Sequence, residues 1–212
     1  MEDKREATSH VEALKSTSII GGSTAIVILI RMVRTKVLAI LLGPAGIGLE
    51  AIYESIISLA KIVVDMGISV SGVRQIASAV GSGNQATIAA TVFTLRRLCL
   101  VLGIFGAAAL FLMREEVSRL TFGNADHAFD IGLLSVILPL SALERGQGVL
   151  IRGLRRTTDL AKIHMVGTAL AVSVCIPIAY IWGLQGIPAC MVLMTAVGVL
   201  ITWSYVRRIR FR

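Results

Sequence analysis

Long apolar runs recur along this chain, and they constrain its fold more than any other feature. They are spaced at roughly 20–35 residues, and a helix of about 20 apolar residues is long enough to cross the hydrocarbon core of a membrane. The 212 residues are 55% hydrophobic, with a mean hydropathy of +0.81, well above what soluble domains carry. We therefore expect an all-α, polytopic membrane protein.

The apolar runs predict six membrane-spanning helices in a single bundle. The chain is expected to divide into a polar segment at 1–16, the spans within 17–206 and a basic tail at 207–212. Pro139 lies inside the fourth span, and the third span has a possible earlier start near residue 89. The expected spans are 17–42, 49–70, 98–113, 131–151, 163–182 and 187–206.

The cations that lie outside these spans are distributed unevenly. With the N-terminus placed in the cytosol, 14 Lys and Arg residues fall in cytosolic segments and only Arg114 and Arg119 fall in outer loops. The positive-inside rule then predicts that both termini are cytosolic. This topology accounts for the net charge of +8 without a nucleic-acid partner, which we do not expect.

Nine charged residues remain inside the predicted spans. A central charge costs about 2.5–3.5 kcal/mol on insertion scales, and such residues normally face a bundle interior or a wet cavity. The cations are Arg31, Arg34, Lys36, Lys61 and Arg145, and the acids are Glu50, Glu54, Asp65 and Glu144.

Helical geometry places five polar residues of the second span on one stripe. At 100° per residue, Glu50, Glu54, Ser58, Lys61 and Asp65 fall within about 80° of one another. Two interpretations are open. The charges neutralise one another and hold the bundle together, or they line a hydrated cavity with a cationic patch for an anionic substrate and acids that bind protons or ions.

The remaining reactive side chains give no sign of catalysis. Cys99, Cys175 and Cys190 lie in apolar runs without metal-ligand spacing, so we expect core residues and no metal site. His164 begins the fifth span and is expected to be an interface or packing residue rather than a proton relay. Because no catalytic triad or nucleotide-binding motif is evident, we expect neither an enzyme nor a cofactor.

Four segments, taken in order, carry a resemblance to a known family. The first, 41–77, holds a Gly-Pro-x-Gly-x-Gly turn and then a long helix that ends near Gly67 and Arg74. The others are "LTFGNADHAFDIGLLSVI" (120–137), "LIRGLRRTTDLA" (150–161) and "GLQGIPA" (183–189). Together they resemble the Wzx-type polysaccharide flippases, especially the O-antigen and enterobacterial-common-antigen translocases of the MATE-like exporter superfamily.

The resemblance implies a substrate and a place in the cell. The substrate is an undecaprenyl-pyrophosphate-linked oligosaccharide, which is flipped across the bacterial inner membrane. Arginine suits a pyrophosphate because its guanidinium group binds phosphate oxygens in a bidentate manner. We therefore assign Arg31, Arg34 and Lys36 to the headgroup, with Lys61 and Arg145 as second choices. Glu54 and Asp65 are assigned to ion or proton coupling, followed by Glu50 and Glu144.

The resemblance also raises a question of stoichiometry. Members of this family have two six-helix lobes, and the match here is to the N-terminal lobe. We expect a truncated or split product, a homodimer, or a lobe that pairs with a separately encoded half, because alternating access needs two bundles. Two other functions stay open. They are a small-molecule or drug:cation antiporter half, and a non-transporting scaffold of a polysaccharide assembly complex.

Overall fold

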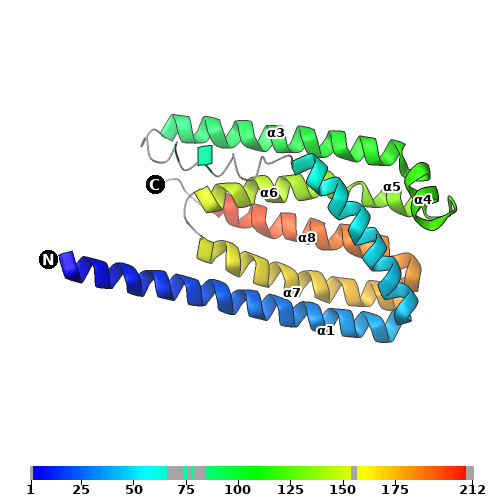
Figure 1. The fold of residues 1–212 in the computed structure, drawn as a ribbon, viewed down its shortest axis with the longest axis horizontal. Coiled ribbons are helices and arrows are strands. Elements are labelled where there is room, and N and C mark those ends of the chain that lie inside the picture. The colour runs from blue at the N-terminus through cyan, green and yellow to red at the C-terminus, as the bar shows by residue number, and fades with distance from the viewer. Residues whose placement is uncertain (1, 66–73, 76–77, 79–84, 154–156, 209–212) are drawn as a thin grey trace.

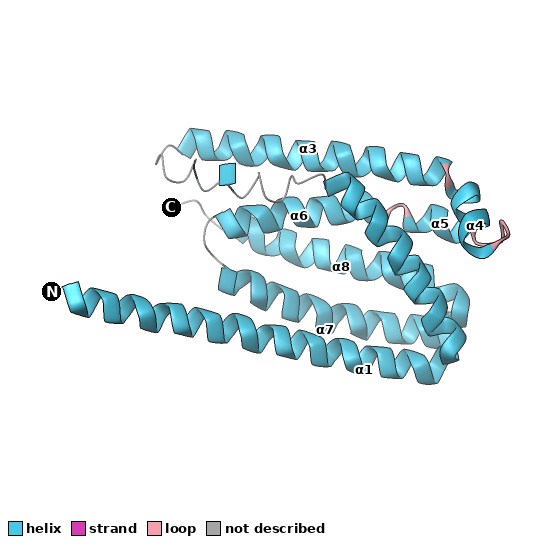
Figure 2. Ribbon diagram, in the orientation of Figure 1, coloured by secondary structure: helices cyan, strands magenta, loops and turns pink. Residues whose placement is uncertain are grey.

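The part of the chain that the structure describes is almost entirely helical. The computed structural model describes residues 2–65, 74–75, 78, 85–153 and 157–208, and no strand occurs in these ranges. The expected all-α class is confirmed (Figure 2). The elements are α1 (Glu2–Asp65), α3 (Gln85–Leu112), α4 (Arg114–Phe122), α5 (Ala128–Leu134), α6 (Ile137–Gly153), α7 (Thr157–Trp182), the 3₁₀ turn η1 (Gly183–Gln185) and α8 (Gly186–Arg208).

The long helices lie side by side and reverse direction from one to the next (Figure 1). α7 packs between α1 and α8, and α6 packs between α3 and α8. α1 begins and α8 ends at the same end of the bundle, whereas α4, α5 and η1 lie at the opposite end. Arg207, a cation expected in the cytosol, lies at the end of α8 on one side of the bundle. Arg114 and Arg119 lie on α4 at the other.

A kink divides α1 into a first limb (2–42) and a second limb (44–65). Gly43 has φ 67° and ψ −174°, and Pro44 follows it. Proline lacks the N–H for a helical hydrogen bond, and it disfavours helical geometry in the residue before it. Glycine adopts the positive φ at little cost. The sequence predicted a break here, but it is shorter than expected because Pro44 to Gly48 are helical.

An ion pair joins the two limbs across this kink. The guanidinium group of Arg34 on the first limb contacts the Oε1 atom of Glu50 on the second limb. The two side chains are only 15% and 19% exposed. Because water screens a shielded pair poorly, this contact favours one angle between the limbs.

The predicted fourth span, 131–151, is wrong as one continuous helix. The structure has α5, then a turn at Ser135 and Val136, and then α6. The amides of Val136 and Leu138 donate to carbonyls three residues back, at 3.2 Å and 3.0 Å. Pro139 needs no amide donor and falls in the first turn of α6, where proline is tolerated. The proline thus marks a new helix.

Other boundaries differ from the expectations in extent. α1 already begins at Glu2 and α7 at Thr157, so segments predicted as polar connections are helical. α3 begins at Gln85, earlier than either predicted start. α4 was not predicted, whereas α8 matches the sixth span closely. The predicted end of the second span, beyond residue 65, lies outside the described residues.

Among the described residues, three clusters of buried side chains help to hold the bundle together. The largest joins Tyr53 and Ile57 of the second limb to Ile131 of α5, Ile137 of α6 and Ile187 of α8. Another joins Leu38 of the first limb to Cys175 and Cys190, and the last joins Ile151, Leu160 and Ile163. The three cysteines are buried, as the sequence predicted.

Among the described helices, two stretches are long and apolar enough to cross a membrane by length and composition. They are Phe93–Leu112 and Thr158–Arg207, and each has a mean hydropathy of 2.0. The second stretch covers α7, η1 and α8. Many large apolar side chains on these helices are exposed, including Phe105, Leu112 and Tyr180. An apolar exterior of this kind fits a lipid environment better than water.

Substituting Gly43 tests the origin of the kink. We expect Gly43→Ala to destabilise the fold by about 1–2 kcal/mol, because an L-residue at positive φ meets that steric cost while no neighbouring atom obstructs the new methyl group. The measurement is the thermal unfolding midpoint in detergent, followed by helical circular dichroism. Gly48→Ala is the matched control. It lies in a helix with equally open space, so its midpoint should stay level or rise.

Removing the charge of Glu50 tests the ion pair. We expect Glu50→Gln to cost about 1–3 kcal/mol, because Arg34 keeps its charge but loses its carboxylate partner. Glu54→Gln, four residues along the same limb, removes a carboxylate that forms no ion pair with another described residue, and it should change stability much less. Equal destabilisation by both variants in chemical unfolding would contradict a special role for the pair.

Candidate functional site

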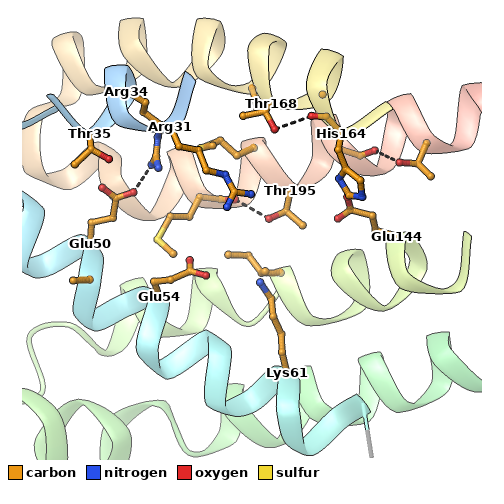
Figure 3. A pocket seen from close by; sticks show the side chains of 18 of the residues that line it. Arg31, Arg34, Thr35, Glu50, Glu54, Lys61, Glu144, His164, Thr168 and Thr195 are labelled. Carbon is orange, nitrogen blue, oxygen red and sulfur yellow. Dashed lines mark hydrogen bonds and ion pairs between the residues drawn. The ribbon is translucent and has the colours of Figure 1, made fainter. Parts of the chain in front are cut away.

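The charged residues of the first two predicted spans meet in a cavity of about 560 Å³. Its walls come from both limbs of α1 and from α6, α7 and α8 (Figure 3). The lining residues are Arg31, Arg34, Thr35, Ile47, Glu50, Ala51, Glu54, Lys61, Ile137, Glu144, Ile163, His164, Gly167, Thr168, Ala171, Met191, Met194, Thr195, Gly198 and Thr202. Six of the nine predicted site residues are among them.

The kink of α1 is what brings these residues together. The first limb supplies Arg31 and Arg34, one turn apart, and the second limb returns with Glu50, Glu54 and Lys61. Figure 3 shows Arg31, Glu54 and Lys61 pointing into the same space from opposite limbs. A straight helix would separate Arg31 from Lys61 by about 45 Å, at 1.5 Å per residue. The cavity therefore depends on the Gly43–Pro44 break.

The two arginines differ in their partners. Arg34 is engaged with Glu50, although its Nε atom is buried without a hydrogen-bond partner in the described structure. Arg31 is exposed to the cavity and makes no ion pair or hydrogen bond with another described residue. The mutual-neutralisation interpretation therefore holds for Arg34 and Glu50 but not for Arg31. A cation without an internal partner is the group best able to bind an anion from outside.

Glu144 of α6 and His164 of α7 form another part of the wall. Both line the cavity, and Figure 3 shows them close together. Across from Glu144, α8 presents Gly198, where an added Cβ would lie 3.2 Å from the Oε1 atom of Glu144. A glycine at this position gives the carboxylate room at the α6–α8 contact.

Threonines on α7 and α8 complete the lining. The hydroxyl groups of Thr168, Thr195 and Thr202 each donate to the carbonyl four residues earlier, at 2.7, 3.0 and 2.8 Å. Since the single hydroxyl proton is used within the helix, each oxygen keeps lone pairs that can accept a hydrogen bond. This side of the cavity is therefore suited to ligands that donate hydrogen bonds, such as hydroxyl-rich molecules.

Three predicted site residues lie elsewhere. Lys36 lines a separate shallow groove on the first limb, together with Arg31 and Thr35. Asp65 and Arg145 face each other instead, with 3.6 Å between Oδ1 and Nε. Glu144 and Arg145 thus point to different neighbours, as their 100° separation on a helix predicted. The functional roles of Lys36, Asp65 and Arg145 stay predictions.

The sequence interpretation missed several lining residues. His164 was expected to be a packing residue, but it is exposed and lines the cavity. Its position four residues before Thr168 was an available signal, because residues four apart share a helical face. Thr195 and Thr202 are seven apart on α8 and carry the same signal. Ser58, part of the predicted stripe, does not line the cavity.

The chemistry available here is electrostatic binding and proton exchange. The cavity combines three permanent cations, three carboxylates and a histidine. Among the described residues, no group of three or more His, Cys, Asp or Glu side chains is placed to hold a metal ion. The arrangement can bind a charged, hydroxyl-rich molecule and can exchange protons at its carboxylates.

Comparison with known proteins supplies a family. A comparison with the curated proteins and one with the solved structures each found no match. The family model described as "Polysaccharide biosynthesis protein" matches residues 37–212. The match begins at the end of the first limb and includes the second limb and every later helix, and so most of the cavity wall. The chain belongs to this polysaccharide biosynthesis family, consistent with a Wzx-like exporter lobe.

Proposed function

We propose that this chain is a transporter lobe that flips undecaprenyl-pyrophosphate-linked oligosaccharides across the bacterial inner membrane. In this proposal the two limbs of α1, α3, the α5–α6 pair, α7 and α8 make six crossings. Both termini are cytosolic, and α4 lies at the outer face. The family match supports a role in polysaccharide biosynthesis. The charge difference between the two ends of the bundle supports the orientation.

The observation that carries the proposal is Arg31, a cation in the cavity without an internal partner. Lys61 faces it from the other limb, and Arg34 lies one turn away (Figure 3). A pyrophosphate offers several anionic oxygens, and guanidinium groups bind these with charge-assisted hydrogen bonds. We assign the pyrophosphate to Arg31 and Lys61, with Arg34 able to exchange Glu50 for a phosphate oxygen.

The rest of the lining fits the other parts of such a substrate. A sugar cannot cross hydrocarbon without replacing its hydration, and the threonine wall of α7 and α8 offers acceptors for its hydroxyl groups. The polyprenyl chain needs no polar site and can stay in the lipid. Glu54 and Glu144 are the carboxylates that we assign to proton or ion coupling, because neither forms an ion pair with another described residue.

Transport by alternating access requires a second bundle that rocks against this one. We therefore propose that a further six-helix lobe completes the cavity, whether supplied by the same polypeptide, a second copy or a separate chain. An antiporter for organic cations is the alternative function, and the three carboxylates of the cavity favour it. It differs from the flippase in that it does not need Arg31, because its substrate is a cation.

Complementation of a flippase-deficient strain tests the proposal. The chain is expressed alone and together with a C-terminal six-helix lobe, and surface polymer is measured on gels. We expect polymer to return when both lobes are present. If neither arrangement restores polymer although both chains reach the membrane, the flippase assignment fails. Restoration of drug efflux instead would support the antiporter.

Substituting the cavity cations tests the headgroup assignment. We expect Arg31→Ala to reduce binding of a lipid-linked pyrophosphate roughly tenfold to a hundredfold, because a hydrogen-bonded charge contributes about 1.5–3 kcal/mol. The measurement is equilibrium binding by the complete transporter in nanodiscs, alongside polymer export in cells. Lys36→Ala is the matched control, because Lys36 does not line the cavity. If both variants bind equally well, Arg31 does not hold the pyrophosphate.

A further inference from the structure

A second polar cluster lies outside the cavity, where the second limb of α1 meets the connection between α4 and α5. Tyr53 is fully buried there, and its hydroxyl group donates to the Oδ2 atom of Asp130 at 2.6 Å. The same hydroxyl lies 2.9 Å from the Nδ1 atom of His127. The Nδ1 atom of His127 is 3.5 Å from the Oδ2 atom of Asp130. None of the three residues lines the cavity.

The direction of these hydrogen bonds indicates which ring nitrogen of His127 carries the proton when the ring is neutral. A tyrosine hydroxyl has one proton, and here it points to Asp130. Its oxygen therefore accepts from His127, which requires a proton on Nδ1. The Nε2 atom remains as the position that can take up a second proton. The cluster is thus built to hold both the neutral and the cationic ring.

A carboxylate and an aromatic ring lie next to the imidazole of His127. The carboxylate of Asp130 provides an opposite charge on one side. The ring of Phe122 on α4 lies 4.1 Å from the imidazole, centroid to centroid, with 35° between the planes. An aromatic face attracts a cation. The ring of Phe122 also packs edge-on against the ring of Tyr53, with 5.9 Å between their centroids. Tyr53 on α1, Phe122 on α4 and His127 in the α4–α5 connection therefore contact one another.

The cluster is open to solution on one side. The side chains of His127 and Asp130 are 30% and 29% exposed, at the end of the bundle opposite the start of α1 (Figure 1). Among the described residues, the titratable groups that contact His127 are Tyr53 from α1 and Asp130 from α5. α4 contributes only the ring of Phe122, and the neighbouring Asp126 is exposed.

We propose that Tyr53, His127 and Asp130 form a proton-binding site that latches the second limb of α1 to α5. Proton uptake at Nε2 converts the His127–Asp130 contact into an ion pair, and Tyr53 transmits the tighter contact to the limb. That limb carries Glu50, Glu54 and Lys61 of the cavity wall. Protons at this end of the molecule thus hold the cavity's charged limb in the arrangement seen here. The latch does not depend on which substrate the cavity takes.

Hydrogen–deuterium exchange of the full chain in nanodiscs tests the latch. Wild type and variants are compared at the same pH, at about 7.5 and about 5.5, which bracket ordinary histidine titration. In wild type, acid should raise the protection of residues 44–65 and 123–134 roughly twofold to fivefold, the effect of a partly exposed ion pair. His127→Gln and Asp130→Asn should each remove this gain in both segments.

Tyr53→Phe separates the latch from a local effect. It keeps the ring packing but removes the hydroxyl, so acid should still protect 123–134 but no longer 44–65. Asp126→Asn is the matched control, because it removes a neighbouring exposed carboxylate that does not line the cavity and should keep the wild-type response. Unchanged exchange in α7 and α8 shows that each variant is folded. A full pH response in His127→Gln, or its loss in Asp126→Asn, would overturn the proposal.

Discussion

The ion pair between Arg34 and Glu50 is the contact on which the site depends. A kink at Gly43 and Pro44 allows many angles between the limbs of α1, and a shielded charge pair selects one of them. That angle places Glu54 and Lys61 opposite Arg31. A buried pair is weak evidence for stability as such, because desolvation offsets much of the attraction. Its value here is geometric, since it determines which charges share the cavity.

With the limbs held in this way, the charged residues of the predicted spans fall into two groups, those that form ion pairs with each other and those that do not. Arg34 and Glu50 satisfy each other, and so do Asp65 and Arg145 near the end of the second limb. Arg31, Lys61, Glu54 and Glu144 make no ion pair with another described residue, yet they line one volume. Paired charges would suffice to hold a bundle together. The cost of keeping unpaired charges among apolar helices argues for a ligand or a proton that balances them.

Sequence reasoning predicted the helical class and the group of in-span charges because both follow from local patterns. Hydrophobic run length indicates a helix, and the 100° periodicity placed Glu50, Glu54 and Lys61 on one face. Pro139 shows the limit of this reasoning, since proline in a first turn and proline inside a helix give the same apolar run. His164 shows another limit. A single helical position does not reveal which neighbouring helix it faces, and that depends on packing with α6 and α8.

The second limb takes part in four of the polar contacts and sites among the described residues. It carries Tyr53 at the latch, Glu50 at the kink pair, Glu54 and Lys61 in the cavity, and Asp65 at the contact with α6. One face of this limb is apolar and packs into the core through Leu49, Ile57 and Val64, whereas the opposite face carries these polar contacts. Polar contacts can exchange partners at less cost than interlocked side chains can repack. An exchange of partners on the polar face would therefore turn the second limb about Gly43, where the helix is broken.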